Sequence, residues 1–475
     1  MKKIYLSFVS LFAFSCFVHA QIINTIEDGQ GAEYIAGNND AANPCITAEQ
    51  YRVIEQRCKD NISLLGINTF VEKGANPPLL QWPLAAATGF TDCGFHFIGA
   101  FVDQNTASGS IQDFNCESNT YDGHHGTDIA TWPYSFYKMD HSSVEIHAAA
   151  AGTIIDKHDG EFDRNCGSNN LTANYVIIQH ADGSRILYWH MKNGAVTTVA
   201  IGQPVAAGDY LGVVGSSGSS SGPHVHFEVW AGSSGSSYND PYSGNCNLLN
   251  VNTWWLAQRP HTEPAILKVS VNTTDLVMGT CPATETPNES SQFTVPFQGP
   301  GLGPGYAKFY IFLREMPTNA VIDVRILNPN GSTFNNWTYT PSVFSKVSYW
   351  GWSKLLPTIA GNYTFQATYN GVTCSTPFEI STTVDVAAIT ATSELQVFPN
   401  PTLDVFTISG EGIENGNYRL TLNNTTGQTL LSENANITSH SIKKAISTAG
   451  LAAGVYFLTV ETDQSRVAKK VYKQN

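Results

Sequence analysis

The segment that decides the fold is Ser221-Gly-Pro-His-Val-His-Phe-Glu228. Its alternation of apolar and polar residues after a Ser/Gly loop is typical of a β-strand with one buried face. Residues i and i+2 of a strand point to the same face, so His224 and His226 share a face, which we expect to be the solvent side. Two imidazoles side by side predict chemistry at that face. The opposite face is apolar and points into a core: Val225, Phe227 and Val229.

Two upstream segments extend this pattern. Gly123-His-His-Gly-Thr-Asp128 places three residues between a histidine and an aspartate, and a second segment, Leu187-Tyr-Trp-His190, ends a strand-like run. The runs 173–180 and 185–190 are joined by Asp182-Gly183, which predicts a β-hairpin. Similar short β-type runs, cut by Gly, Asn and Asp, continue from about 80 to 230. We therefore expect an antiparallel β-sheet that carries both segments.

The residue types in these segments match a catalytic zinc site. Such a site takes three protein ligands from His and carboxylates and leaves the fourth position to water. His124, Asp128 and His226 supply one such set, which predicts one zinc ion per catalytic domain. His125 is a weaker candidate, because the register to Asp128 favours its neighbour. Two histidines remain to act as general base, general acid or oxyanion stabiliser: His190 and His224.

The order of these motifs, H-x-x-x-D, then Y-x-H, then G-x-S-x-G-P-H-x-H-F-E, resembles the lysostaphin-type zinc metalloendopeptidases over roughly 80–235. The resemblance implies an open cleft, zinc on His124, Asp128 and His226, and catalytic roles for His190 and His224. Related peptidoglycan carboxypeptidases have a longer gap between the His and Asp ligands, so the three-residue gap favours the endopeptidase branch. An insertion between Ile155 and Ala173 departs from the family, and we expect it to reshape one wall of the cleft.

The N-terminus predicts export. Lys2 and Lys3 precede an apolar run, Ile4 to Val18, and small residues before Gln21 complete a signal peptide over 1–20. No other run is apolar enough to be an integral membrane segment. The chain has 25 basic and 39 acidic residues, so removing Lys2 and Lys3 leaves 23 − 39 = −16. Such an acidic surface excludes nucleic acid as a natural partner.

The cysteines predict disulfides. Removal of the signal peptide takes away one of nine cysteines, and an even number without a CxxC pair is typical of an exported, disulfide-bonded protein. Sequence alone does not fix the connectivity. Order along the chain suggests Cys45–Cys58, Cys93–Cys116, Cys166–Cys246 and Cys281–Cys374.

The last eighty residues carry a second resemblance. Val397-Phe-Pro-Asn-Pro-Thr402, Gly454-Val-Tyr-Phe-Leu-Thr-Val460 and the basic pair Lys469-Lys470 resemble the C-terminal sorting domain of the type IX secretion pathway of Bacteroidetes. Such domains are small β-sandwiches. The resemblance implies that outer-membrane secretion machinery is a partner and that the protein is extracellular or attached to the cell surface. A generic interaction sandwich is the alternative.

The whole sequence predicts an all-β protein: an antiparallel β-sheet catalytic domain with an open cleft, followed by two β-sandwich domains. Residues 21–79 contain one predicted helix, Thr47 to Asn61, opened by a capping Thr47 with Gln50 three residues on. This segment is either an inhibitory pro-segment or a structural cap. The expected divisions are 1–20 signal peptide, 21–79 N-terminal segment, 80–245 zinc metallopeptidase domain, 246–265 connector, 266–385 immunoglobulin-like β-sandwich, 386–394 linker and 395–475 sorting domain.

The function that follows is a secreted zinc metalloendopeptidase. The resemblance implies a substrate in peptidoglycan cross-links or glycine-rich polypeptides, cleaved by zinc-activated water with help from His190 and His224. A second enzyme hypothesis is a protease of extracellular structural proteins. The non-enzyme alternative is a surface adhesin or scaffold, and the full set of predicted ligands weighs against it.

Overall fold

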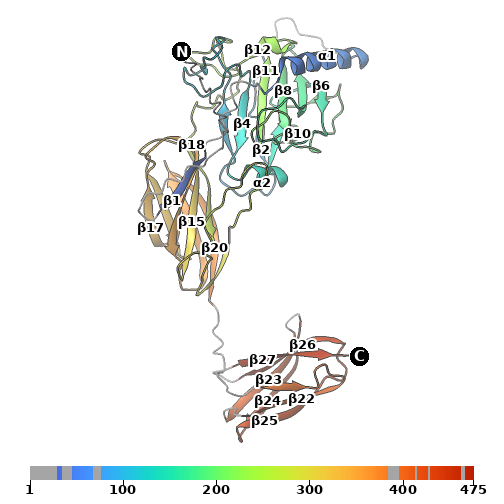
Figure 1. Cartoon of the computed structure of the whole chain (residues 1–475), viewed down its shortest axis with the longest axis vertical. Helices are drawn as coiled ribbons and strands as arrows, with labels where there is room; N and C mark the ends of the chain where they lie inside the picture. The colour runs from blue at the N-terminus through green and yellow to red at the C-terminus, as the bar shows by residue number, and fades with distance from the viewer. Residues whose placement is uncertain are drawn as a thin grey trace, which may run out of the picture. The chain divides into compact units, whose positions relative to one another are not determined.

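A computed structural model describes residues 29–34, 45–67, 76–382, 395–411, 415–425, 428–461 and 466–474, which fall in two compact units, Met1–Thr382 and Thr383–Asn475. The predicted signal peptide, 1–20, and linker, 386–394, lie outside the described residues. The fold is all-β, as the sequence predicts (Figure 1). Among the described helices, none has the length and apolar character needed to cross a membrane.

The first unit is built around an antiparallel eight-stranded sheet, which we call the main sheet. Its order is β3-β4-β11-β8-β7-β6-β9. The eighth strand, β12, pairs with the end of β11, at Val229 and Trp230. The strands are β3 (His96–Ala100), β4 (Thr127–Thr131), β6 (Gly152–His158), β7 (Asn174–Gln179), β8 (Arg185–Met191), β9 (Pro204–Val205), β11 (His224–Trp230) and β12 (Tyr238–Asn239).

Strand β11 lies between β4 and β8, and this neighbourhood places the predicted site. In the register, His226 pairs with Asp128 on one side and with Trp189, next to His190, on the other. The predicted hairpin is confirmed: β7 and β8 pair antiparallel, and Gly183 in the turn has φ +88°. The expected apolar face of β11 is also confirmed, because its three residues lie in the core: Val225, Phe227 and Val229.

A smaller sheet and two helices complete this part of the unit. The small sheet has the order β10-β5-β2, and its strands are β2 (Leu84–Ala86), β5 (Val144–His147) and β10 (Tyr210–Val213). Helix α2 (Ser135–Asp140) follows β4, and a short 3-10 helix, Gly235–Ser237, precedes β12. The sequence-predicted helix is confirmed as α1 (Ala48–Leu64), and Thr47 and Gln50 form the expected capping box. Figure 1 shows α1 beside the β6 end of the main sheet.

The middle of the chain forms a sandwich whose two sheets enclose one apolar core. One sheet has the order β1-β18-β15-β13 and the other β14-β20-β19-β16-β17, with β14 and β20 parallel. The strands are β1 (Gly29–Tyr34), β13 (Ala265–Asn272), β14 (Gln292–Val295), β15 (Tyr306–Met316), β16 (Ile322–Leu327), β17 (Thr333–Tyr339), β18 (Ser345–Leu355), β19 (Gly361–Tyr369) and β20 (Val372–Thr382).

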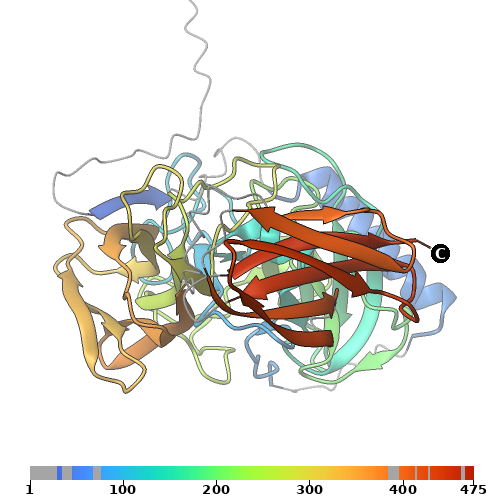
Figure 2. The ribbon, with the colours of Figure 1, turned by 90° about the horizontal axis from the view of Figure 1, so that it is seen from below.

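The second unit is a smaller sandwich of a three-stranded and a four-stranded sheet, seen from another side in Figure 2. Apolar side chains of both sheets form its core, among them Phe406, Leu420 and Leu458. The strands are β21 (Gln396–Phe398), β22 (Val405–Glu411), β23 (Gly416–Asn424), β24 (Thr429–Ile437), β25 (Ser441–Ser447), β26 (Gly454–Glu461) and β27 (Arg466–Lys473).

The cysteine pairing suggested by chain order is wrong in all four pairs. Among the described residues, the disulfides are Cys93–Cys374, Cys116–Cys246 and Cys166–Cys281, with Cα–Cα distances of 5.8, 5.1 and 5.7 Å. Cys45 and Cys58 are both buried thiols. Ten residues of helix separate Ala48 from Cys58, about 15 Å, whereas a disulfide needs Cα atoms within about 7 Å. The bonds therefore follow spatial neighbours that chain order does not reveal.

Candidate metal centre

The three predicted ligands come from two strands of the main sheet and the loop before one of them. Asp128 lies in β4 and His226 in β11, opposite each other in the register. His124 is held in the loop by a bond from Nδ1 to the carbonyl oxygen of Phe101, 2.6 Å away. Gly126, between the ligands, leaves space for His226, because a Cβ there would lie 2.7 Å from the Cε1 of His226. The local sequence therefore brings His124 and Asp128 against the strand of His226.

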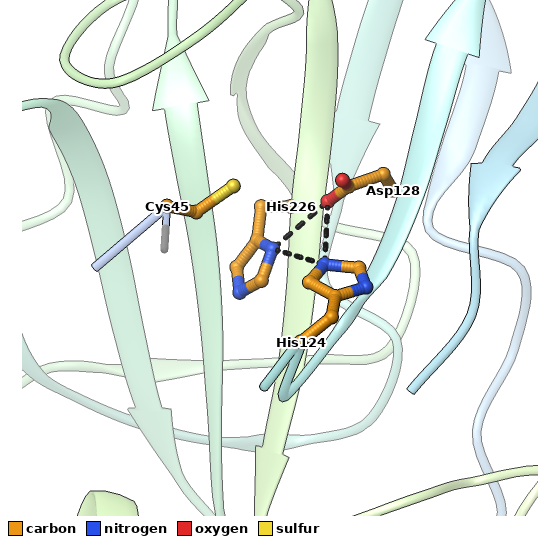
Figure 3. A group of neighbouring side chains, drawn as sticks. All are labelled: Cys45, His124, Asp128 and His226. Carbon is orange, nitrogen blue, oxygen red and sulfur yellow. Dashed lines mark hydrogen bonds and ion pairs between the residues drawn. The ribbon is translucent and has the colours of Figure 1, made fainter. Parts of the chain in front are cut away.

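The three ligand atoms are close enough to share one ion (Figure 3). His124 Nε2 lies 3.1 Å from Asp128 Oδ1 and 3.1 Å from His226 Nδ1, and His226 Nδ1 lies 2.8 Å from Asp128 Oδ1. Ligand atoms about 2.0–2.1 Å from a tetrahedral zinc would lie about 3.3 Å apart. Two imidazoles and one carboxylate at these separations fit a zinc ion by both donor type and spacing.

The outer nitrogen of each candidate ligand histidine is fixed by a neighbouring acceptor. Phe101 holds His124, and the carboxylate of Glu228 accepts from Nε2 of His226 at 3.0 Å. Glu228 is fully buried, and it also accepts from Trp230 Nε1 at 2.7 Å and from the Tyr51 hydroxyl at 2.8 Å. Such partners set the ring orientation and tautomer of a metal-bound histidine. They leave His124 Nε2 and His226 Nδ1 facing the proposed ion.

The other two predicted site residues lie beside this group. His190 and His224 have ring centroids 4.5 Å apart. Each donates through Nδ1 to a backbone carbonyl, His190 to Ser217 at 2.6 Å and His224 to Gly222 at 2.8 Å. Both Nε2 atoms are buried without a hydrogen-bond partner. His190 also has φ +67°, a strained backbone conformation of the kind found at functional sites.

The site is more buried than the sequence predicts. His224 and His226 were expected on a solvent-side face, but they are only 5% and 1% exposed, so that expectation is wrong. The reason is that the N-terminal segment covers this part of the main sheet: Cys45, Ile46 and Ile54 pack in one cluster with Trp189 and Trp230. The alternation of apolar and polar residues in β11 does not reveal this burial, because the covering segment lies far upstream in the sequence.

Burial and charge act in opposite directions on the ligands. Burial favours their neutral forms, yet nearby histidines hold the pKa of Asp128 well below its ordinary value, and hydrogen bonds to Asp128 and other groups raise the pKa of His226. Both shifts favour an ion pair, with the proton on His226 and the negative charge on Asp128. In contrast, burial and the neighbouring His224 lower the pKa of His190, which keeps that ring neutral.

A cleft of about 620 Å³ opens beside the ligands, lined by Asp128 and His224 among others. One wall includes Cys281, whose disulfide to Cys166 anchors the insertion that follows β6. Arg164 of the insertion reinforces this link by donating to the carbonyl of Pro282 at 2.8 Å. The insertion is therefore tied to a residue that lines the cleft, and its reshaping of that wall stays a prediction.

Three further residues lie near the proposed ligands, one of them a weaker candidate and two of them missed by the sequence analysis. His125, the weaker candidate, stacks on Tyr238 at 3.8 Å instead of joining the ligand group. Glu228 was missed, although its spacing of two from His226 already places it on the same strand face. Cys45 was also missed, and its thiol lies among the ligand atoms of His124, Asp128 and His226, all within 4.8 Å of one another (Figure 3). No local motif marks Cys45.

Two family matches agree with the two resemblances. Residues 122–240 match Peptidase family M23, and residues 396–474 match the Secretion system C-terminal sorting domain. Among curated proteins, an uncharacterized metalloprotease of Buchnera aphidicola subsp. Baizongia pistaciae is 42% identical over 98 residues, 21% of this chain and 25% of that protein. The DD-carboxypeptidase/endopeptidase Mpg of Neisseria meningitidis serogroup B is 44% identical over 84 residues, 18% of this chain and 16% of that protein. The chain thus spans a quarter or less of the length of these relatives.

Parts of the chain are also similar to solved structures. A zinc-containing peptidase from Vibrio cholerae is 18% identical, with a TM-score of 0.23, and the match covers 38% of this chain and 44% of that one. The catalytic domain of a mutant of the prophage-encoded M23 protein EnpA from Enterococcus faecalis is 22% identical, with a TM-score of 0.16, and the match covers 32% and 85%.

Proposed function

From a chain that carries a Peptidase family M23 domain and a secretion system C-terminal sorting domain, we propose an exported zinc metalloendopeptidase. The observation that carries this proposal is the convergence of two sets of side chains. His124, Asp128 and His226 offer three ligand atoms within 3.1 Å of one another. Beside them, His190 and His224 have buried Nε2 atoms without hydrogen-bond partners.

The tautomers of the two histidines suit proton transfer. A carbonyl oxygen can only accept, so the bonds to Ser217 and Gly222 place the proton on Nδ1 of His190 and His224. The His190 ring, which burial keeps neutral, then presents an unprotonated Nε2 that can take a proton from water. Although burial opposes it, Asp128 raises the pKa of His224, so this ring is better suited to donate a proton to the leaving amine or to stabilise the oxyanion. A zinc ion on the three ligands would supply Lewis acidity for the scissile carbonyl and a bound water of lowered pKa.

For the substrate, we propose peptide bonds in peptidoglycan cross-links or in glycine-rich polypeptides. The resemblance to the lysostaphin-type family supports this class, and so does the three-residue gap between His124 and Asp128. The cleft beside Asp128 and His224 offers space for a substrate chain next to these side chains. The sorting domain supports delivery outside the outer membrane, with the secretion machinery as partner and the cell surface or medium as destination.

Hydrolysis by the secreted protein tests this function, with its N-terminus determined by sequencing. We expect cleavage of cross-linked peptidoglycan peptides or a glycine-rich polypeptide, loss of cleavage on chelation, and recovery with zinc. His226→Ala and His224→Ala should abolish cleavage, whereas His125→Ala should retain it. Unchanged cleavage by His226→Ala would overturn the mechanism. Cleavage of elastin-like protein alone would instead favour a protease of extracellular structural proteins.

A further inference from the structure

The segment before α1 brings a thiol into the proposed metal centre. We propose that Cys45 is a fourth ligand of the ion and that the N-terminal segment thereby holds the full-length chain latent. This inference rests on the proposed zinc-dependent function. The sequence left open whether this segment is a structural cap or an inhibitory pro-segment. In this proposal, residues 45–67 do both: they cover the site, and they keep the chain inactive.

The position of the sulfur is the main observation. Cys45 Sγ forms one group with ligand atoms of His124, Asp128 and His226, and a second group with His190 and His224, each within 4.8 Å. The thiol therefore lies within 4.8 Å both of the three proposed metal ligands and of the two histidines that would move protons. A hydrolytic water would need a free position on the ion that these side chains would hold. Catalytic zinc sites keep this fourth position open, and a fourth protein ligand closes it.

The unpartnered nitrogens give a second, independent sign that the space is built for a ligand. Nε2 of His190 and of His224 are both buried without hydrogen-bond partners, and the two rings are 0% and 5% exposed. Nearly all buried polar atoms in proteins have a hydrogen-bond partner. Two buried nitrogens without one, both close to the same thiol, therefore need an explanation. A bound ion with water or substrate in that space would satisfy them once Cys45 has left.

The segment that carries Cys45 is fixed at several points. The Cys45 sulfur is 2.8 Å from the hydroxyl of Tyr121, which stacks on the His124 ring at 4.1 Å. From α1, the Tyr51 hydroxyl donates to Glu228, the acceptor for His226. These contacts join the segment to both histidine ligands.

Further along α1, the segment is attached to the main sheet. Arg57 pairs with the fully buried carboxylate of Asp156 at 2.9 Å, and Asn61 donates to the backbone oxygen of Ile155 at 3.0 Å. Docking of α1 thus sets the position of the thiol. Release of the segment would remove the fourth ligand and uncover the two histidines.

Binding of the Cys45 sulfur to the ion would be reversible and would involve only a proton and a water. The Cys45 thiol loses its proton to solvent as sulfur binds the ion, and withdrawal of the segment breaks that bond and lets water take its place. No oxidant or reductant takes part. Cys58, also buried and only thirteen residues away, belongs to neither ligand group and provides a matched control.

The test uses the full chain loaded with one equivalent of Co²⁺ in place of zinc. We expect a near-ultraviolet sulfur-to-cobalt charge-transfer band in the wild type and in Cys58→Ser, and loss of the band in Cys45→Ser with cobalt still bound. Zinc should protect Cys45 of the wild type from alkylation, located by peptide mass mapping, which requires no variant. Full-length Cys45→Ser should also hydrolyse substrate faster than the wild type.

The outcomes separate the two proposals. Stoichiometric cobalt without the band in the wild type, or equal alkylation of Cys45 with and without zinc, would overturn the ligand assignment and leave the metallopeptidase intact. A band with equal hydrolysis by wild type and Cys45→Ser would overturn latency. Failure of every variant and the wild type to bind metal would overturn the proposed function itself, and this inference with it.

Discussion

The two proposed histidine ligands, His124 and His226, are oriented by atoms outside the proposed metal site. Phe101 holds the ring of His124 through its backbone, and Glu228 holds His226 through a buried carboxylate. His226 Nδ1 and Asp128 Oδ1 lie 2.8 Å apart, a hydrogen-bond distance. Because metal ligands must be deprotonated, an ion bound here would displace the proton of that hydrogen bond.

Glu228→Gln should weaken zinc binding roughly 10- to 100-fold, because a neutral amide orients His226 less strongly and makes it less basic. Competition with a chelator measures the affinity. Glu145→Gln is the matched control, since Glu145 also pairs with a histidine two residues away, His147, at 2.9 Å but outside the site. Equal zinc affinity in the two variants would show that Glu228 has no role in holding the ligand.

His96 predicts a pH dependence of stability. Its ring is buried, accepts from Arg314 at 3.0 Å, and burial with the nearby arginines lowers its pKa to about 4. Since the unfolded chain binds a proton near pH 6.5 and the folded chain does not, its contribution is present above pH 6.5 and is lost as pH falls toward 4. The unfolding free energy of the wild type relative to His96→Gln should fall by about 3 kcal/mol over that range. A constant difference would show that His96 titrates alike in both states.

At the scale of elements, local patterns were sufficient for β11, for the β7–β8 hairpin and for α1. Alternation in β11 and the turn residues between β7 and β8 act over a few positions, as does the cap at Thr47. The cover of the main sheet was not predictable in this way. Cys45 lies beside His226 although it is 181 positions upstream, and no local sequence pattern in either segment predicts this contact.

Arg57→Ala should loosen α1 from the main sheet. It leaves the buried carboxylate of Asp156 without its cation, although Tyr175 still donates to it at 2.7 Å. Because the Arg57 side chain is 42% exposed, we expect the free energy that holds α1 on the sheet to fall by about 2 kcal/mol, a value between those of a surface ion pair and a buried one. Native-state hydrogen exchange of the α1 amides measures this loss. Arg52→Ala, which removes an exposed pair with Glu49, should change it little; equal effects of both variants would contradict the buried-pair account.

At the scale of the whole molecule, the resemblances identified the peptidase and sorting domains, but the cysteine connectivity escaped prediction. Two bonds, Cys93–Cys374 and Cys166–Cys281, join the first part of the chain to the middle sandwich within one unit. Sequence order favours neighbours, whereas folding brought together cysteines separated by 281 and 115 residues. Only the three-dimensional arrangement supplies those pairs.

Peptide mapping without reduction tests the connectivity. A digest of the secreted protein should contain three cross-linked pairs, Cys93 with Cys374, Cys116 with Cys246 and Cys166 with Cys281, and each should separate on reduction. Cys45 and Cys58 should be recovered as thiols. A peptide in which Cys45 is bonded to Cys58 would contradict both the fold of α1 and the place of Cys45 beside the site.

The central claim is that His124, Asp128 and His226 hold one zinc ion. X-ray diffraction from zinc-loaded crystals, recorded on both sides of the zinc absorption edge, tests it most directly. The account predicts one anomalous peak in the first unit, about 2.0–2.2 Å from His124 Nε2, an Asp128 carboxylate oxygen and His226 Nδ1. A peak on His125, or no peak among these three side chains, would contradict it.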